Sequence, residues 1–342
     1  MPNRKITIKE IAQMADVSPT AVSFVLNGRK GIGEATKEKI LSVIKETDYC
    51  PSVASQRLVL RKSFNVAFVY PTDFSPFTDL FYYEVANGLT EELTLNGYNV
   101  VFTPVAADDG NAEQNFPQIV KRRDADGVIF LYDVPQALLD RCDELKIPNV
   151  LLDWQSVDES RTIVSLDSEQ AIYNAVTYLV EKGHKEIAFL GSGRYPNYYL
   201  RCFAGYQNAL YAAQLPMYPG WIHHTVNDFE SAAESVNKLM AAPTKPTAVC
   251  CMSDMCAVNA ILAAAQNGIK IPDQLSFISI DDILLGQYIH PRLTTISYKK
   301  LEIGKIAAQL LMKKMNGDDE NAKSVMIKSD IVIERQTVKS LI

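Results

Sequence analysis

Residues 7–28, TIKEIAQMADVSPTAVSFVLNG, decide the fold of the first part of the chain. Thr7 and Glu10 have the spacing of a capping box, in which a Thr side chain caps a helix and the Glu side chain reaches back to the cap. Ser18 is a strong helix cap, and Pro19 after it suits a first helical position, where no N–H is needed. The stretch therefore predicts two short helices joined by a tight turn.

A third helix is predicted from about Glu34 to Thr47, after the helix-end signal Asn27-Gly28. Three such helices have helix-turn-helix geometry, and the second helix of this motif enters the major groove of DNA. Small helical hairpins that bind no DNA share the spacing, so it leaves both interpretations open. The apolar side chains expected to face the core are Ile8, Ile11, Ala12, Ala15, Val22, Val25, Leu26, Ile40, Leu41 and Ile44.

The two parts of the chain differ in charge. Residues 1–62 contain 11 Lys and Arg but 6 Asp and Glu, a net charge of +5, whereas the remaining residues carry a net charge of −11. A basic head on an acidic body indicates that only the head meets phosphate, although a solvated basic arm has the same pattern. Residues 53–60, VASQRLVL, are too short for a stable isolated helix and are predicted to fold on a partner.

From residue 64 onward, short apolar strands alternate with helical stretches of ten or more residues. Such alternation predicts parallel sheets covered by helices on both faces. The strands outnumber what one compact sheet needs. The predicted fold class is therefore α/β, with an all-α helix-turn-helix head followed by two doubly wound α/β lobes. The predicted strands cover residues 64–70, 100–102, 127–131, 149–152, 186–190, 248–251 and 276–280.

Ligands of doubly wound folds bind beyond the carboxyl ends of the strands, here between the two lobes. The polar residues at predicted strand ends are Asp73, Asp153, Asp167, Ser253, Asp254, Asp281 and Asp282. Each can simply cap the following helix, but together they rim one cleft. The aromatic residues after Asp73 are Phe74, Phe77, Phe81, Tyr82 and Tyr83. Rings with carboxylates suit a carbohydrate; a nucleobase or another metabolite, and a core or dimer-face role for the rings, are the alternatives.

These features resemble the lac/gal repressor (LacI/GalR) family over the whole chain. The head matches it in residues 7–28, in the spacing from Thr36 to Tyr49 and Pro51, and in the segment that ends at Leu58. The body resembles the family's periplasmic-binding-protein-like effector domain in VLLD ending at 153, VSLD ending at 167, Gly205-Tyr206, SDMCAV from 253 and ISIDDI before HPRLTTI. The resemblance implies a ligand-responsive transcriptional repressor that binds a near-palindromic operator as a homodimer.

The resemblance also assigns roles in DNA binding. Pro19, Thr20 and Phe24 match base-reading positions, and Leu58 matches a leucine that wedges into the minor groove and kinks the DNA. Positions that hold phosphates match Ser18, Ser23, Asn27 and Thr36. The full set of predicted DNA-binding residues is Thr7, Ser18, Pro19, Thr20, Ser23, Phe24, Asn27, Thr36, Tyr49, Ser52, Ser55, Gln56 and Leu58.

The head departs from the family pattern at several positions. Phe24 stands where many relatives have Arg or His, which removes a bidentate purine contact and leaves the operator sequence open. Gly33 replaces the usual Ser cap of the third helix, and residues 55–57 differ from the common hinge sequence. These departures concern which DNA sequence is bound rather than DNA binding itself.

For the body, the residues expected at the effector site are Asp73, Phe77, Asp153, Trp154, Asp167, Arg201, Phe229, Ser253, Asp254 and Asp281. Among them, Phe229 matches a position that often stacks on a sugar face. Trp154 replaces the usual Arg after VLLD, and Cys202 stands where the family has an Arg three residues before Gly205. Arg201 lies one position earlier.

The predicted function is repression of carbohydrate-utilisation genes, with the effector in the interlobe cleft modulating operator affinity. The alternative is a sugar- or nucleobase-binding protein, or a corepressor-dependent regulator of another pathway. The predicted domains are a DNA-binding head at 1–50, a hinge helix and linker at 51–63, and an effector-binding and dimerisation domain at 64–342. Its two lobes are expected to comprise about 64–165 with 297–325, and about 166–296 with 326–342.

No enzyme activity, metal or cofactor is predicted. Gly191-Ser192-Gly193 lacks the third Gly or the Lys of a phosphate-binding motif. Cys250 and Cys251 are adjacent on a strand and point in opposite directions, which does not suit a metal site. The N-terminus is polar where a signal peptide is apolar, and no apolar run approaches the roughly 20 residues of a membrane-spanning helix. A cytoplasmic protein is therefore expected.

Overall fold

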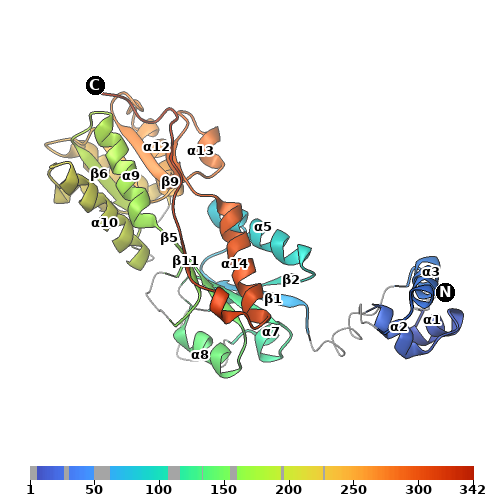
Figure 1. The fold of residues 1–342 in the computed structure, drawn as a ribbon. Helices are drawn as coiled ribbons and strands as arrows, with labels where there is room; N and C mark the ends of the chain where they lie inside the picture. Colours follow the sequence, from blue (N-terminus) through green and yellow to red (C-terminus); the bar gives the residue numbers. More distant parts are fainter. Residues whose placement is uncertain are drawn as a thin grey trace. The chain divides into compact units, whose positions relative to one another are not determined.

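The computed structural model describes residues 6–26, 31–49, 62–106, 116–132, 134–154, 160–193, 196–225 and 228–342. The chain divides into two compact units, Met1–Phe64 and Asn65–Ile342 (Figure 1). The segment predicted to form the hinge, apart from residues 62–63, lies outside the described part of the chain. The limits of the hinge and of the two lobes stay predictions.

The first unit is a head of three helices, α1 (Ile8–Met14), α2 (Pro19–Leu26) and α3 (Glu34–Glu46). The predicted capping box is confirmed, because Glu10 N donates to Thr7 Oγ1 and Thr7 N donates to Glu10 Oε2. Pro19 is the first residue of α2, and Ala21 N donates to Ser18 Oγ at 3.2 Å. The fully buried core of the head consists of Ile11, Ala12, Ala15, Val22 and Ile40.

The expected burial of Leu41 is wrong, since this side chain is 46% exposed. Ile40 is fully buried and Ile44, one turn later, packs partly against the same core. Successive residues of a helix are rotated by about 100°, so Leu41 points away from the face that Ile40 and Ile44 share. A run of adjacent apolar residues therefore did not mean a run of buried ones.

The second unit begins with a six-stranded sheet in the order β11-β5-β4-β3-β1-β2, with parallel pairing throughout. Its strands are β1 (Asn65–Pro71), β2 (Asn99–Val105), β3 (Gly127–Leu131), β4 (Asn149–Leu152), β5 (Ile163–Leu166) and β11 (Val325–Ile327). The helices packed on it are α5 (Leu80–Leu95), α7 (Gln118–Lys121), α8 (Gln136–Glu144) and α14 (Lys300–Met315). The short helix η2 (Asp319–Asn321) leads into β11.

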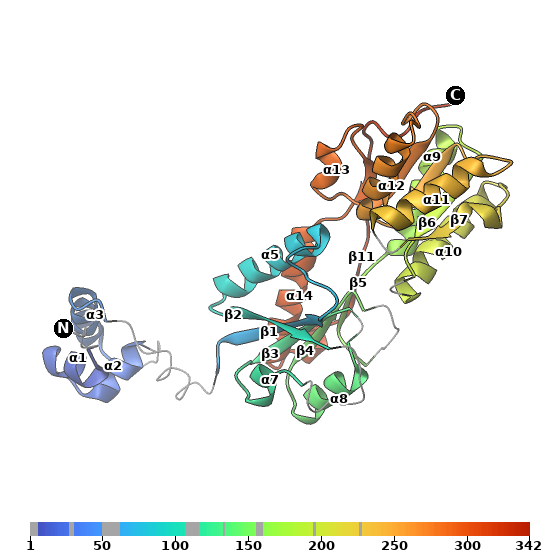
Figure 2. The same cartoon turned by 180° about the vertical axis from the view of Figure 1, so that it is seen from behind.

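The second sheet also has six strands, in the order β12-β10-β9-β8-β6-β7, and only β10 and β12 pair antiparallel. Its strands are β6 (Ile187–Gly191), β7 (Ile222–His224), β8 (Ala248–Cys251), β9 (Ser276–Asp281), β10 (Thr294–Ser297) and β12 (Val332–Ile333). Figure 2 shows α11 and α12 over one face of this sheet. The helices of this region are α9 (Ser168–Glu181), α10 (Pro196–Ala212), α11 (Phe229–Ala241), α12 (Asp254–Gln266) and α13 (Leu285–Tyr288), with η1 (Pro219–Trp221) before β7.

The predicted fold class, a helical head followed by two doubly wound α/β lobes, is confirmed. The strands β5, β7, β10, β11 and β12 are additional to those predicted, and each has two to four residues. The chain passes between the two sheets from β5 to α9, from β10 to α14 and from β11 to β12. These passages bring the strand ends of both sheets into one compact unit.

Two glycines allow the helices α5 and α14 to pack closely against each other. A Cβ atom on Gly88 of α5 would lie 2.1 Å from the backbone oxygen of Leu301, and one on Gly304 of α14 would lie 2.0 Å from that of Val85. No side chain fits there, so α5 and α14 pack backbone to backbone. The start of α5 is thereby held against the segment that leads out of β10.

Candidate functional site

A pocket of about 230 Å³ lies at the carboxyl ends of strands from both sheets. Tyr132 and Asp153 follow β3 and β4 of the first sheet, while Ser192, Met252 and Asp281 follow or end β6, β8 and β9 of the second. Strand ends are where doubly wound folds bind ligands. The pocket is lined by Phe74, Thr78, Asp79, Leu80, Phe81, Tyr82, Tyr132, Asp153, Leu166, Ser192, Tyr198, Met252, Ser253, Met255, Asp281 and Ile283.

On the side of the first sheet, α5 places a carboxylate and a phenol in the pocket. Asp79 caps α5, and its Oδ1 accepts hydrogen bonds from Phe81 N and Tyr82 N, each at 3.0 Å. The Tyr82 hydroxyl donates to Asp153 Oδ2, which fixes the buried Asp153 side chain. Burial raises the pKa of Asp79, and burial together with the Asp153 carboxylate holds the pKa of Tyr82 well above its usual range. Tyr82 therefore stays a hydrogen-bond donor at neutral pH.

Three rings form a cluster in the wall of the pocket. Phe74 and Tyr132 have centroids 4.8 Å apart, Tyr82 and Tyr132 4.9 Å apart, and Phe74 and Tyr82 5.4 Å apart. All three contacts are edge to face, the arrangement that the ring quadrupoles favour. The pocket thus combines aromatic walls with carboxylates.

On the side of the second sheet, Asp254 is a fully buried structural residue. Its Oδ1 accepts hydrogen bonds from Ser279 Oγ and Thr295 Oγ1, both at 2.6 Å, and its Oδ2 accepts one from Ile283 N at 2.8 Å. Burial raises the pKa of Asp254 to about 6 despite these bonds. The side chain ties the start of α12 to β9 and β10, and it is not among the residues that line the pocket.

Asp281 ends β9 in the left-handed region, with a φ of +121°, and it lines the pocket. Its Oδ2 accepts a hydrogen bond from Asp254 N at 3.3 Å. Burial, followed by the nearby carboxylates of Asp254 and Asp79, raises the pKa of Asp281 well above its usual range. The pocket is therefore a place where negative charge is costly.

Lys300 anchors the loop that contains Asp281 and Asp282, which we call the Asp281 loop. Its Nζ donates to the backbone oxygens of Asp281 at 2.9 Å and Asp282 at 2.7 Å, and it lies 3.4 Å from Glu84 Oε1. The Lys300 side chain is only 5% exposed. Because Lys300 begins α14 and Glu84 lies on α5, this one ammonium group connects the rim of the second sheet to two helices of the first.

The structure brings together only part of the predicted effector set. Asp153, Ser253 and Asp281 line the pocket. The predicted residues that do not line it are Asp73, Phe77, Trp154, Asp167, Arg201, Phe229 and Asp254. These seven residues lie outside this pocket for reasons that differ between residues, and their part in effector binding stays a prediction.

Most of these residues lie outside the pocket because their side chains point away from it or cap a helix. Trp154 follows Asp153 directly and points to the opposite face, where it is buried in the core with α7 and α8. Phe77 is 55% exposed and packs on the ring of Phe102 instead. Asp167 caps α9 by accepting a hydrogen bond from Gln170 N. Asp73 is exposed, Arg201 lies on α10, and Phe229 is the first residue of α11.

Several pocket residues were not predicted. The lining residues outside the predicted set include Phe74, Thr78, Asp79, Phe81, Tyr82, Tyr132 and Tyr198. The aromatic stretch after Asp73 contributes Phe74, Phe81 and Tyr82 to the pocket, but not Phe77. Tyr132 directly follows a predicted strand, so the strand-end rule points to it once uncharged polar residues are considered. Tyr198 carries no such signal.

In the head, the predicted base-reading helix presents polar residues at its start. Ser18, Pro19 and Thr20 are exposed, and Ser23 and Phe24 are half-buried on the same helix. Thr36 and Tyr49 are half-buried, and Tyr49 packs against the core of the head. The predicted DNA-binding residues that lie outside the described part of the chain are Asn27, Ser52, Ser55, Gln56 and Leu58.

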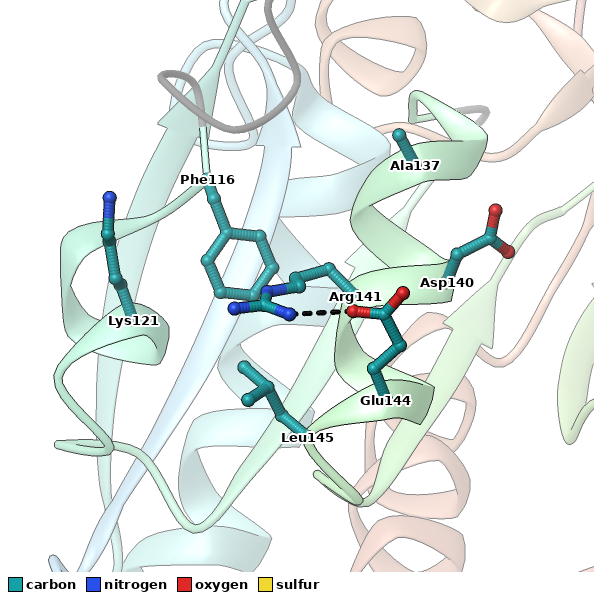
Figure 3. A pocket seen from close by; sticks show the side chains of 7 residues that line it. All are labelled: Phe116, Lys121, Ala137, Asp140, Arg141, Glu144 and Leu145. Carbon is teal, nitrogen blue, oxygen red and sulfur yellow. Dashed lines mark hydrogen bonds and ion pairs between the residues drawn. The ribbon is translucent and has the colours of Figure 1, made fainter.

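A second pocket, of about 480 Å³, lies between α7 and α8 on the first sheet (Figure 3). It is lined by Phe116, Lys121, Ala137, Asp140, Arg141, Glu144 and Leu145. Figure 3 shows Arg141 directed at Glu144, with which it forms an ion pair of 2.6 Å. None of these residues ends a strand, so the strand-end pocket is the better candidate despite its smaller volume.

In the described part of the chain, no three His, Cys, Asp or Glu side chains come together as metal ligands would. No described helix is long and apolar enough to cross a membrane.

Comparisons with known proteins agree with this geometry. Residues 7–52 match the family described as bacterial regulatory proteins, lacI family, and residues 176–338 match the periplasmic binding protein-like domain. The chain is 31% identical over 340 residues to the HTH-type transcriptional repressor PurR of Vibrio parahaemolyticus, covering 98% of this chain and 99% of that protein. It is 29% identical over 335 residues to the ribose operon repressor of Haemophilus influenzae, covering 98% and 99%.

Among solved structures, the lac repressor dimer bound to operator and the anti-inducer ONPF has a TM-score of 0.81 with this chain. The two share 20% sequence identity, and the match covers 98% of this chain and 100% of that one. The likeness therefore extends over the head and both lobes.

Proposed function

Because the chain belongs to the lacI family of bacterial regulatory proteins, we propose that the strand-end pocket binds its effector and that this effector is a carbohydrate. Membership makes the chain a ligand-responsive, DNA-binding transcriptional repressor and not an enzyme. One observation carries the effector proposal: Asp153, Asp281 and the Tyr82 ring meet around one pocket at the strand ends of both sheets.

The chemistry of the pocket supports a carbohydrate. Carboxylate oxygens accept hydrogen bonds from sugar hydroxyls, and aromatic rings pack on the C–H faces of a sugar ring. A pocket of about 230 Å³ is smaller than the roughly 300–1,000 Å³ typical for drug-sized ligands, which favours a monosaccharide. A relative that is named ribose operon repressor supports the same class.

The proposal is tested by measuring how candidate effectors change the affinity for operator DNA. The full-length chain is bound to an operator selected from random DNA, and pentoses and hexoses are titrated while fluorescence anisotropy reports binding. We expect one sugar to change operator affinity by about 5–150-fold, the usual range of allosteric coupling. Asp281→Asn should abolish this response, whereas Asp319→Asn, an exposed carboxylate on η2, should keep it. A normal response in Asp281→Asn rules out the pocket.

A nucleobase is the second candidate effector. The edge-to-face rings of Phe74, Tyr82 and Tyr132 also present the aromatic surface on which a planar base packs. Free nucleobases therefore belong in the same titration. If a nucleobase changes operator affinity and no sugar does, the effector is a nucleobase.

For the head, we propose that α2 reads the operator in the cytoplasm as part of a homodimer. Pro19, Thr20 and Phe24 contact bases and Ser18 contacts phosphate, which the exposure of the start of α2 supports. Specific binding should weaken steeply with salt, with a slope near −0.9 per phosphate neutralised. Leu58→Ala should weaken specific binding more than non-specific binding, because a minor-groove wedge acts only on the kinked operator. An equal loss of both argues against the wedge.

A further inference from the structure

We infer that α2 recognises the methyl groups of thymine, so that each half-site of the operator has A·T base pairs where Pro19 and Phe24 enter the major groove. This inference rests on the proposed function, because it takes α2 as the helix that reads the operator. It narrows an operator sequence that the departure at Phe24 left open. The bases under α2 are selected by apolar contact and not by paired hydrogen bonds to a purine.

The side chains of α2 exclude most ways of reading a base. The helix has the sequence PTAVSFVL over Pro19–Leu26, without Arg, Lys, His, Asn, Gln, Asp or Glu. In the major groove, Arg and Lys read guanine, Asn and Gln read adenine, and Asp and Glu accept from cytosine. None of these contacts is available to α2 itself. Hydroxyl groups such as that of Thr20 bind several bases, so the apolar side chains remain to discriminate, and they can select the thymine methyl.

The fold of the head decides which side chains of α2 can reach DNA. Val22 is fully buried in the core that α2 shares with α1 and α3. Residues two positions away from it in a helix are rotated by about 200°, so Thr20 and Phe24 lie on the opposite face. Pro19 and Thr20 are exposed in the first turn, the part of this motif that lies over the base edges. Pro19, Thr20 and Phe24 therefore form the surface of α2 that can meet DNA.

The Phe24 ring has a close neighbour that restricts its movement. A Cβ atom added to Gly31 would lie 3.8 Å from Cε2 and 3.9 Å from Cδ2 of the ring, so one ring edge lies beside the segment that leads into α3. Phe24 is half-buried, which leaves part of its surface accessible. An aromatic side chain has only two rotatable bonds, and a neighbour at this distance limits them further. Contact between Phe24 and DNA therefore costs little conformational entropy.

The inference is tested by removing single methyl groups from the operator. An operator is selected from random DNA with the full-length chain, and each thymine of a half-site is then replaced in turn by deoxyuridine. This replacement keeps the base pair and removes only the methyl group. Fluorescence anisotropy at fixed salt measures the affinity. We expect at least one thymine at which the replacement weakens specific binding about three- to fivefold, the effect of burying one methyl group.

A cytosine substitution gives the reverse test at the same base pair. C·G in place of T·A removes the methyl group, and 5-methylcytosine returns a methyl group to the same place in the major groove. The operator with 5-methylcytosine should bind about three- to fivefold more tightly than the operator with unmodified cytosine. Both tests use the wild-type chain, so they do not depend on the folding of a variant. Changes below about 1.5-fold in both tests overturn the inference.

Variants of α2 assign the methyl contacts to side chains. Phe24→Ala should abolish the loss that deoxyuridine causes at one thymine of the half-site, because no ring then contacts the methyl group. The double variant of Pro19→Ala with Phe24→Ala should abolish the loss at every thymine under α2. Leu41→Ala is the matched control, since it truncates an apolar side chain that is 46% exposed on α3, and it should keep every loss. Unchanged non-specific DNA binding shows that the head of each variant is folded.

The outcomes also separate the inference from the proposed function. An operator that binds specifically but does not respond to deoxyuridine overturns the inference and leaves the head as a reader of DNA. A deoxyuridine loss that persists in the double variant assigns the methyl contacts to residues outside α2, which also overturns the inference. If the selection yields no preferred sequence, the proposed role of α2 in reading the operator fails as well.

Discussion

Asp254 and Asp281 belong to the same rim of the second sheet, but their surroundings differ. Both oxygens of Asp254 accept hydrogen bonds from within the fold, and the side chain is fully buried. Asp281 has one such bond and lines the pocket. Of these two carboxylates, the one whose oxygens are both used by the fold is part of the core, and the one with a single such bond lines the pocket.

The largest effect that tests this comparison is on stability. Asp254→Ala leaves Ser279 Oγ, Thr295 Oγ1 and Ile283 N without their acceptor in a buried place. We expect the free energy of unfolding to fall by about 3 kcal/mol or more, because each stranded donor costs about 1–3 kcal/mol. Urea denaturation followed by circular dichroism measures the change.

Asp281→Asn is the matched variant for that measurement. The amide keeps an oxygen for Asp254 N and tolerates the left-handed backbone, so the loss should stay below about 1 kcal/mol. Equal losses in Asp254→Ala and Asp281→Asn would contradict the distinction between a structural and a ligand-facing carboxylate.

The pH dependence of stability gives a second, somewhat smaller effect. Burial raises the pKa of Asp254 to about 6, above the value of about 3.9 for an unfolded Asp. Between these values the folded state holds a proton that the unfolded state has lost. The stability from this group is therefore complete below about pH 4 and is lost as the pH rises through about 6.

The wild-type chain and Asp254→Asn should differ accordingly. From about pH 4 to 6, the free energy of unfolding of the wild type should fall on the order of 2–3 kcal/mol relative to the variant, because Asn does not titrate. Carboxylates that do not interact with Asp254 contribute equally to both proteins, so the difference reports Asp254 together with Asp281, whose pKa the Asp254 carboxylate raises. Urea denaturation at several pH values measures it, and parallel curves would show that Asp254 does not titrate in this window.

Lys300 holds the loop that carries Asp281, the pocket-lining carboxylate of this comparison. Lys300→Met keeps the length of the side chain but removes the donor to the backbone oxygens of Asp281 and Asp282. We expect a loss of about 2 kcal/mol in the free energy of unfolding, since hydrogen bonds from charged groups contribute about 1.5–3 kcal/mol. Effector affinity should also fall, by about tenfold, because the Asp281 loop loses its anchor.

The control for Lys300→Met is Lys305→Met on the same helix. Lys305 pairs with Glu91 at 2.9 Å on a partly exposed surface, so its loss removes a screened contact rather than a buried one. Unchanged effector affinity in Lys300→Met would show that the loop keeps its position without this ammonium group.

The fold was readable from the sequence because its signals are local. Capping residues such as Thr7 and Ser18 act within one helical turn, and the long apolar strands alternate with helices. The site was readable only in part. The strand-end rule located Asp153 and Asp281, but the partners that bury Asp254, Ser279 and Thr295, lie 25 and 41 residues away along the chain. No local sequence pattern reveals hydrogen bonds between residues that lie so far apart along the chain.

The sequence also did not reveal in which direction each side chain points. Asp153 and Trp154 are adjacent, and the backbone turns one into the pocket and the other into the core. Phe74 and Phe77 belong to one aromatic stretch, but only Phe74 packs with Tyr82 and Tyr132 at the pocket. Which ring of such a run faces a ligand depends on the path of the loop, which composition does not determine.

The smallest expected effect concerns the larger pocket between α7 and α8. Arg141 and Glu144 form an ion pair there, but their side chains are 49% and 65% exposed, so solvent screens the attraction. Arg141→Ala should change the free energy of unfolding by no more than about 0.5 kcal/mol. Operator binding and the effector response should match the wild type in the anisotropy assay. A lost effector response in Arg141→Ala, with Asp281→Asn still responsive, would move the effector site to this surface and reverse the ranking of the two pockets.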